Sequence, residues 1–254
     1  MSLGQIKNLV LPLPALAEQK RIAKILDKAE AIRRKRQQAL DLADDFLRSL
    51  FLDMFGDPCR NPKGWPVAPL SRLAQIWSGS TPSRKDPANY GGQIPWVKTT
   101  EVNGREILDT EETVSEKGIA SARLKLFPPG SILVALYGQG KTRGRCALLG
   151  IHAATNQACG VLMPSQNFEP LFQMAQLSLS YDRLRALGQG GNQPNLNLGL
   201  LGSFSVINPP LLLQQKFVSL VHIMRNITGR TTQAFNQAQS LFKCLQHRTF
   251  SGEI

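Results

Sequence analysis

Apolar residues recur with a helical period in two stretches near the two ends of the chain. In the first, from residue 14 to 56, one row repeats every seven residues and comprises Ile22, Ala29, Arg36, Ala43 and Leu50. In the second, from residue 206 to 254, the apolar stripe comprises Phe217, Leu220, Val221, Met224, Ile227, Ala234, Phe235, Ala238, Leu241, Phe242 and Leu245. A seven-residue repeat over about five heptads favours long helices that pair along their length over ordinary core helices. The pattern therefore predicts two long helices that pack as a coiled coil.

The two stretches also match each other in sequence. A constant shift of 196 positions takes Pro14 to Pro210 and Gly56 to Gly252 without a gap. Identical residues between these limits include Gln19 and Gln215, Lys20 and Lys216, Arg34 and Arg230, and Phe46 and Phe242. We interpret the match as an internal repeat. The alternative is that two amphipathic helices share residue types without common origin.

Between the helices, from residue 57 to 205, apolar residues come in short runs. Those at 94–97, 131–136 and 158–162 are separated by Gly, Pro and Asn, which is typical of short strands joined by long loops. A single helical pattern covers 171–187. We expect an α+β fold, with one mixed α/β domain inserted between the two helices, and a strand or loop over residues 1–13 that leads into the first helix.

The charge balance narrows the class of partner. The chain carries 30 Lys and Arg against 18 Asp and Glu, a formal charge of +12. Such an excess indicates a polyanion, either DNA, RNA or an acidic membrane surface. The sequence has neither a run of about 18 apolar residues nor a signal-peptide layout, so we expect a cytoplasmic protein. The four Cys and three His are scattered, so a metal site is not expected.

The loops of the middle domain are polar and basic. Arg, Lys, Gln and Asn side chains reach base edges in the major groove, whereas Thr, Ser and backbone amides suit phosphate oxygens. The candidates for DNA contact are Thr81, Arg84, Lys98, Thr99, Tyr137, Gln139, Lys141, Thr142, Arg143, Arg145 and Gln193. Each loop alone is also explained by ordinary surface turns. The basic run at 33–36 similarly fits either a solvated helix face or a phosphate contact.

Two motifs resemble those of enzymes. Gly140-Lys141-Thr142 follows an apolar run, as in a phosphate-binding loop, but the residues after it form a poor helix start. Asn208-Pro209-Pro210-Leu211 resembles the motif with which amino-methyltransferases hold a flipped base, but Leu211 cannot stack as an aromatic residue does. We therefore expect a non-catalytic chain that binds no cofactor of its own. A nucleotide-binding enzyme that uses Gly140-Lys141-Thr142 is the alternative, and a coiled-coil interaction protein without DNA is a third hypothesis.

The order of short motifs resembles that of the specificity subunit of type I restriction-modification systems. The segments that carry the resemblance are 16–22 (LAEQKRI), 51–58 (FLDMFGDP), 61–65 (NPKGW), 79–82 (GSTP), 94–98 (IPWVK), 137–144 (YGQGKTRG) and 193–196 (QPNL). No single motif is strict, but their order and spacing cover nearly the whole chain.

The resemblance implies an assembly. Specificity subunits usually carry two target-recognition domains, each followed by a long helix, and the two helices pack antiparallel as a spacer. Modification subunits that bind S-adenosylmethionine and methylate adenine dock on them, and restriction subunits can join. This chain has one recognition domain, at 57–205, so the resemblance implies a half-subunit or a fragment. A half-subunit would form a homodimer through its helices and direct methylation and restriction to a symmetric, bipartite DNA site, with no membrane involved.

Overall fold

The computed structural model describes residues 15–138, 140–188 and 195–226. It divides the chain into two units, one formed by residues 1–47 with 221–254 and the other by residues 48–220. The lead-in predicted at 1–13 and the end of the predicted second helix, 227–254, lie outside the described residues. The second unit holds the whole of the region, 57–205, in which the sequence predicts a mixed domain.

The first long helix, α2 (Leu16–Phe55), has 40 residues and is about 60 Å long at 1.5 Å per residue. It contains no Gly or Pro and is rich in strong helix formers, which favours one continuous helix. Arg33 and Arg34 of the basic run both pair with Glu30, at 2.7 and 3.2 Å, on the helix surface. Gly56 ends the helix with φ +78°, a conformation that glycine adopts without strain.

The second helix begins later than the sequence predicts. Residues 205–207 form strand β10 (Ser205–Ile207), and residues 211–226 are helical. Pro209 and Pro210 separate the two elements, since proline cannot continue a strand ladder but suits a helix start. The prediction that the helix includes 206 and 207 is therefore wrong, because the backbone of both residues pairs in a sheet.

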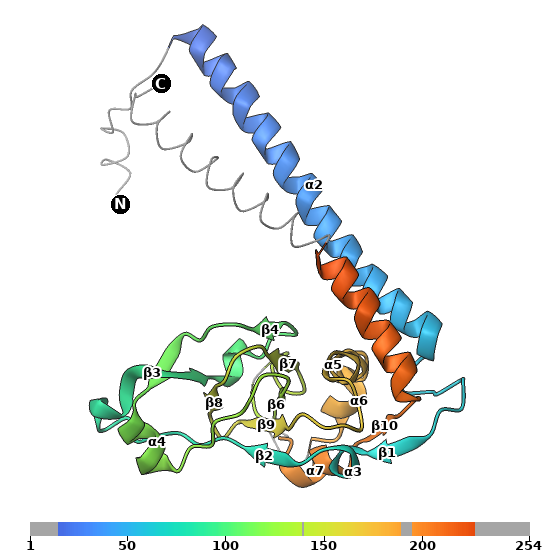
Figure 1. The fold of residues 1–254 in the computed structure, drawn as a ribbon. Coiled ribbons are helices and arrows are strands. Elements are labelled where there is room, and N and C mark those ends of the chain that lie inside the picture. The colour runs from blue at the N-terminus through green and yellow to red at the C-terminus, as the bar shows by residue number, and fades with distance from the viewer. Residues whose placement is uncertain (1–14, 139, 189–194, 227–254) are drawn as a thin grey trace. The chain divides into compact units, whose positions relative to one another are not determined.

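Three sheets form the body of the second unit (Figure 1). A two-stranded sheet joins β1 (Val67–Pro69) to β10 in antiparallel register. A five-stranded sheet has the order β2 (Ile76–Ser78), β9 (Cys159–Leu162), β6 (Ile132–Ala135), β7 (Cys146–Leu149), β4 (Glu106–Ile107). A three-stranded sheet has the order β5 (Glu112–Val114), β3 (Tyr90–Val97), β8 (Ala154–Thr155). Parallel pairs, β3 with β8 and β4 with β7, mix with antiparallel ones.

Short helices connect and cover these sheets. They are α3 (Leu70–Leu73), α4 (Glu116–Ala122), α5 (Pro170–Leu179), α6 (Tyr181–Ala186) and α7 (Leu198–Ser203), with 3-10 turns η1 (Pro87–Asn89) and η2 (Thr99–Glu101). The single helix predicted over 171–187 is in fact two, because the chain leaves helical geometry at Ser180. The prediction also missed α3, α4 and α7, which are too short for a helical period to show.

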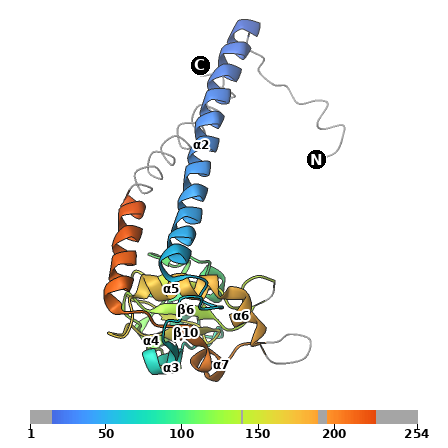
Figure 2. The same cartoon turned by 90° about the vertical axis from the view of Figure 1, so that its right-hand side faces the viewer.

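The central sheet is apolar on both faces. Neighbouring side chains of a strand point to opposite sides, and its strands β6, β7 and β9 are buried at every position. In β6, Ile132 and Val134 join the core under α5, α6 and α7, whereas Leu133 and Ala135 join the core on the opposite face. Helix α5 lies against β7 and shields the first of these cores (Figures 1 and 2). All four residues of β6 are therefore fully buried, and the strand reads as an unbroken apolar run.

A cluster of four phenylalanines fixes the last turns of α2 to this unit. Phe51 and Phe55 meet Phe172 of α5 and Phe217 of the second helix, with ring centroids 4.8 to 6.4 Å apart. All four side chains are at most 1% exposed. The indole N–H of Trp65 donates to the Phe55 carbonyl at 2.9 Å. Residues from three distant parts of the sequence thus share one apolar contact.

Candidate nucleic-acid interface

The loop between β6 and β7, residues 136–145, is held against helix α6. The hydroxyl of Tyr181 donates to the Lys141 carbonyl at 2.9 Å and accepts from Nη1 of Arg185 at 3.0 Å. The same Nη1 lies 3.4 Å from the Arg143 carbonyl, a long and weak contact. Gly144 has φ +84°, and a Cβ there would lie 3.5 Å from Cβ of Arg185. The left-handed turn is therefore what favours glycine at this position, since a Cβ at 3.5 Å would make an ordinary contact with the helix.

Arg143 lies largely inside this junction. Its residue exposure is 9%, and its guanidinium rests against Gly188, where a Cβ would lie 3.3 Å from Cζ. Nε of Arg143 is buried without a hydrogen-bond partner among the described residues. A guanidinium keeps its charge at any physiological pH, and leaving a charged donor unpaired is costly. An acceptor from outside the described chain would satisfy it.

Three further cations surround Arg143. Lys141 is exposed, and Arg145 and Arg185 are half-buried. Together with Arg143 they form what we call the loop–helix cluster. None of the four makes an ion pair with a carboxylate of the described residues, although eight such pairs occur elsewhere. A set of unpaired cations on one loop and the adjacent helix has the electrostatics of an anion-binding surface.

Two further candidates lie on the same loop. The ring of Tyr137 is 40% exposed, so it is free to stack on or hydrogen-bond to a ligand. Thr142 is half-buried and packs behind Gly138, where a Cβ would overlap it at 2.7 Å. Gln139 and Gln193, also predicted to contact DNA, lie outside the described residues. The structure thus gathers Tyr137, Lys141, Thr142, Arg143 and Arg145 on one loop.

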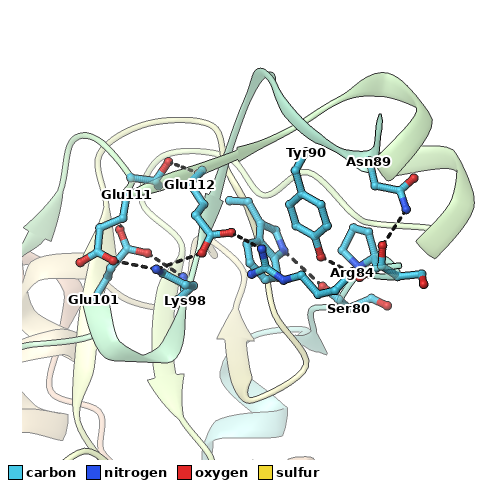
Figure 3. Close-up of polar contacts among 12 residues, drawn as sticks. Ser80, Arg84, Asn89, Tyr90, Lys98, Glu101, Glu111 and Glu112 are labelled. Atoms are coloured by element: carbon cyan, nitrogen blue, oxygen red, sulfur yellow. Dashed lines mark hydrogen bonds and ion pairs between the residues drawn. The ribbon is translucent and has the colours of Figure 1, made fainter. Parts of the chain in front are cut away.

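Arg84 and Lys98 lie in a different place, against the three-stranded sheet (Figure 3). The guanidinium of Arg84 pairs with Glu112 at 2.6 Å and stacks 4.2 Å from the ring centroid of Tyr90. The ammonium of Lys98 pairs with Glu111 at 2.7 Å and with Glu112 at 3.1 Å. Both charges are therefore neutralised within the protein, unlike those of the loop–helix cluster.

The hydroxyl groups of two threonines that the sequence predicts as DNA contacts, Thr81 and Thr99, are hydrogen-bonded within the protein. Thr99 is 8% exposed and donates to Oδ1 of Asn156 at 2.9 Å, so its hydroxyl already has a partner within the protein, and its contact with DNA stays a prediction. Thr81 is exposed, and its hydroxyl donates to the side chain of Gln157. Gly79, two residues before Thr81, lies where its backbone closely approaches that of Thr155. A Cβ at Gly79 would lie 1.9 Å from the Thr155 carbonyl oxygen. The glycine of this motif therefore has a structural role.

The Arg84–Glu112 pair predicts a pH-dependent stability. Hydrogen bonding from Arg84, and then from Lys98, holds the pKa of Glu112 below its ordinary value of 4.5. Since the folded pKa is the lower one, the stabilisation is complete above pH 4.5 and disappears as the pH falls through the folded pKa. We expect Glu112→Gln to lower the urea midpoint at pH 7 and to approach the wild type once the pH falls below the lowered pKa of Glu112. Glu111→Gln, at a more exposed carboxylate, is the control, and a gap that is independent of pH would contradict the assignment.

The phosphate-loop alternative lacks its structural requirement. Lys141 and Thr142 are followed by a turn and by strand β7, whereas a phosphate-binding loop needs a helix whose N-terminus faces the anion. The Asn208-Pro209-Pro210 segment likewise serves as a connection, since Asn208 N–H donates to the Pro66 carbonyl at 2.7 Å and the helix begins directly afterwards. Neither motif has the setting of the enzyme site that it resembles.

Other chemistry is sparse in the described part of the chain. No group of three or more His, Cys, Asp or Glu there is placed to hold a metal ion. Burial raises the pKa of the Cys146 and Cys159 thiols to about 11, which keeps both thiols protonated. No described helix is long and apolar enough to cross a bilayer.

The contacts of α6 with the loop were not predicted from the sequence. Tyr181 and Arg185 fell within a stretch interpreted as a single core helix, and Gly188 within a polar loop. The available signal was the alternation Arg183, Leu184, Arg185 at the end of an apolar helix, which places cations beside a buried leucine.

The fold is that of a mixed α/β domain, and the unpaired cations give it a surface whose electrostatics suit a polyanion. The family model described as "Type I restriction modification DNA specificity domain" matches residues 1–42 and 62–238, which is most of the chain, and the chain belongs to this family.

Individual relatives of this chain are also specificity subunits of type I restriction enzymes. The MjaIX specificity subunit of Methanocaldococcus jannaschii is 26% identical over 165 residues, which cover 63% of this chain and 38% of the relative. The EcoR124I/EcoR124II specificity subunit of Escherichia coli is 25% identical over 240 residues, which cover 89% of this chain and 58% of the relative. The chain thus spans less than two thirds of the length of these relatives.

Solved structures share the fold. The HsdS subunit from Thermoanaerobacter tengcongensis gives a TM-score of 0.56 at 18% identity and covers all of this chain and 63% of that one. The S subunit from M. genitalium gives a TM-score of 0.63 at 15% identity and covers 98% of this chain and 65% of that one. The predicted resemblance to specificity subunits is therefore confirmed.

Proposed function

We propose that this chain is a non-catalytic, sequence-specific DNA-reading subunit of a type I restriction-modification system. It directs adenine methylation and restriction by partner subunits to a bipartite site in double-stranded DNA. The observation that carries the proposal is the match to the family's DNA specificity domain over residues 1–42 and 62–238. The unpaired cations of the loop–helix cluster support it, since phosphate contacts from Lys and Arg supply most of a protein's affinity for DNA.

We further propose that the loop from Tyr137 to Arg145 enters the DNA groove. Lys141 and Arg145 contact phosphates, and Arg143 reads a base. Thr81, Arg84 and Lys98 lie outside this primary contact, because the charges of Arg84 and Lys98 are already paired with Glu112. Gln139 and Gln193 stay predicted base contacts.

The partners follow from the family relationship. Modification subunits bind S-adenosylmethionine and dock on the two long helices, and restriction subunits join that complex in the cytoplasm. One recognition domain reads one half of a split site, so two copies joined antiparallel through their helices would read a symmetric one. The seven-residue apolar repeat of the two stretches, at 14–56 and 206–254 of the sequence, supports a pairing of the two helices.

Sequencing of methylated adenines tests the function as a whole. The host is compared with a strain that lacks this gene, and the gene is then returned. We expect one symmetric, interrupted motif to lose methylation and to regain it. Retention of every methylated motif in the deleted strain would contradict the proposal.

Arg143→Ala tests the base contact. We expect a loss of about 1–3 kcal/mol in binding to the recognised duplex, with relaxed preference at one position of the site. Selection from a randomised duplex library by the assembled complex measures both. An equal loss on all sequences, with a salt dependence shallower by about one phosphate, would instead assign Arg143 to the DNA backbone.

A further inference from the structure

Helix α6 contacts the DNA-reading loop through two side chains that themselves form a hydrogen-bonded pair. Nη1 of Arg185 donates a hydrogen bond to the Tyr181 hydroxyl at 3.0 Å, and that hydroxyl donates one to the Lys141 carbonyl at 2.9 Å. The guanidinium of Arg185 also lies 5.9 Å from the Tyr181 ring centroid. The chain of contacts therefore runs from the end of α6 to the backbone on either side of Thr142.

These contacts act on the loop's backbone and do not neutralise its charged side chains. We call Tyr181 and Arg185 together the bracket. Both of its acceptors, at Lys141 and Arg143, are carbonyl oxygens, so the bracket holds the turn without neutralising the cations that the turn carries. Leu184, between the two bracket residues, is fully buried in the core under the central sheet. The bracket is thus anchored to the rigid body of the unit.

We propose that Tyr181 and Arg185 are positioning residues for sequence recognition, which set the angle at which the 141–144 backbone presents Arg143 to a base edge. A bidentate contact with a base depends on direction, whereas attraction to phosphate hardly does. Loss of the bracket therefore lowers discrimination between sequences more than it lowers overall affinity. This inference rests on the proposed function, because it explains how the proposed DNA-reading site would discriminate between base sequences.

Tyr181→Phe is the sharpest variant, since it removes one hydroxyl and changes no charge. The full chain, assembled with its modification subunits, first selects a duplex from a randomised library. Affinity for the selected duplex and for a scrambled duplex of equal composition is then measured across a salt series. We expect Tyr181→Phe and Arg185→Ala each to reduce the ratio of the two affinities roughly tenfold. We also expect Tyr181→Phe to leave the salt dependence unchanged.

Arg183→Ala is the matched control, because it removes the same charge from the same helix. Its exposed side chain lies over the ring of Phe204, 5.1 Å from the centroid, and makes no described contact with the loop. Arg185→Lys keeps the charge but lacks the planar fork, so we expect it to behave like Arg185→Ala.

Two results would overturn the inference. One is a wild-type affinity ratio in Tyr181→Phe. The other is an equal loss on both duplexes in Arg185→Ala with a shallower salt dependence, which would make Arg185 a phosphate contact. If the wild-type complex selects no duplex at all, the proposed function falls as well, so the two failures are distinguishable.

Discussion

Phe55→Ala is expected to destabilise the protein by about 3–5 kcal/mol, more than any other single change considered for this chain. Phe55 is fully buried and touches Phe51, Phe172 and Phe217, with ring centroids 5.0, 4.8 and 5.8 Å away. Truncation removes the transfer energy of the ring and leaves a cavity between three elements that cannot close it independently. Urea unfolding followed by far-ultraviolet circular dichroism measures the loss.

Leu52→Ala is the control for this change. Leu52 occupies the same turn of α2 but is 36% exposed, so its truncation should cost far less than that of Phe55. If the two variants unfold at the same urea concentration, the aromatic cluster does not contribute as its burial indicates. The comparison separates packing from helix propensity, because both replacements introduce the same residue into the same helix.

Neutralising Lys141 and Arg145 together should weaken DNA binding severely at low salt. If each contacts one phosphate, the slope of log affinity against log salt becomes shallower by about 1.8 in the Lys141→Gln, Arg145→Gln double variant. If the two affinities are equal at about 1 M salt, linear extrapolation to about 50 mM gives a loss on the order of 100-fold. Fluorescence anisotropy with a labelled duplex between 50 and 200 mM salt measures both quantities.

The matched control removes the same two charges from the other group of predicted residues. Arg84→Gln with Lys98→Gln changes the net charge equally, but both side chains are occupied by Glu111 and Glu112. We expect the salt slope of this variant to equal that of the wild type. A larger slope change here than in the loop variant would show that the ion pairs open on binding and that DNA contacts the three-stranded sheet.

The sequence predicted the elements whose pattern is long. The helix over 14–56 corresponds to Leu16–Phe55, because forty residues without Gly or Pro give a clear period. The run at 131–136 contains β6, since a strand buried on both faces reads as continuous apolar residues. The strands β4 and β8, with two residues each, are too short for a pattern and form only because partner strands supply their hydrogen bonds.

The candidate site residues were chosen by residue type, which does not show which charges are paired within the protein. Arg84, Lys98, Lys141 and Arg145 look equivalent in the sequence, yet Glu111 and Glu112 neutralise the first two through contacts across the sheet. Thr99 was assigned to a loop surface and is buried because Asn156, more than fifty residues away, accepts its hydroxyl. Long-range contacts of this kind decide which charges remain available, and no local pattern contains them.

The antiparallel pairing of β1 with β10 brings together the points where the chain enters and leaves the body of the second unit. Val67 lies opposite Ile207, and the backbone of Asn208 reaches back to Pro66. Everything between them is an insertion whose two ends meet in a single ladder. A gene segment coding for a different reading head, with the same two-strand neck, would thus exchange for this one without a change of helix sequence. If the unit reads DNA as proposed, such an exchange would change the target preference in one step.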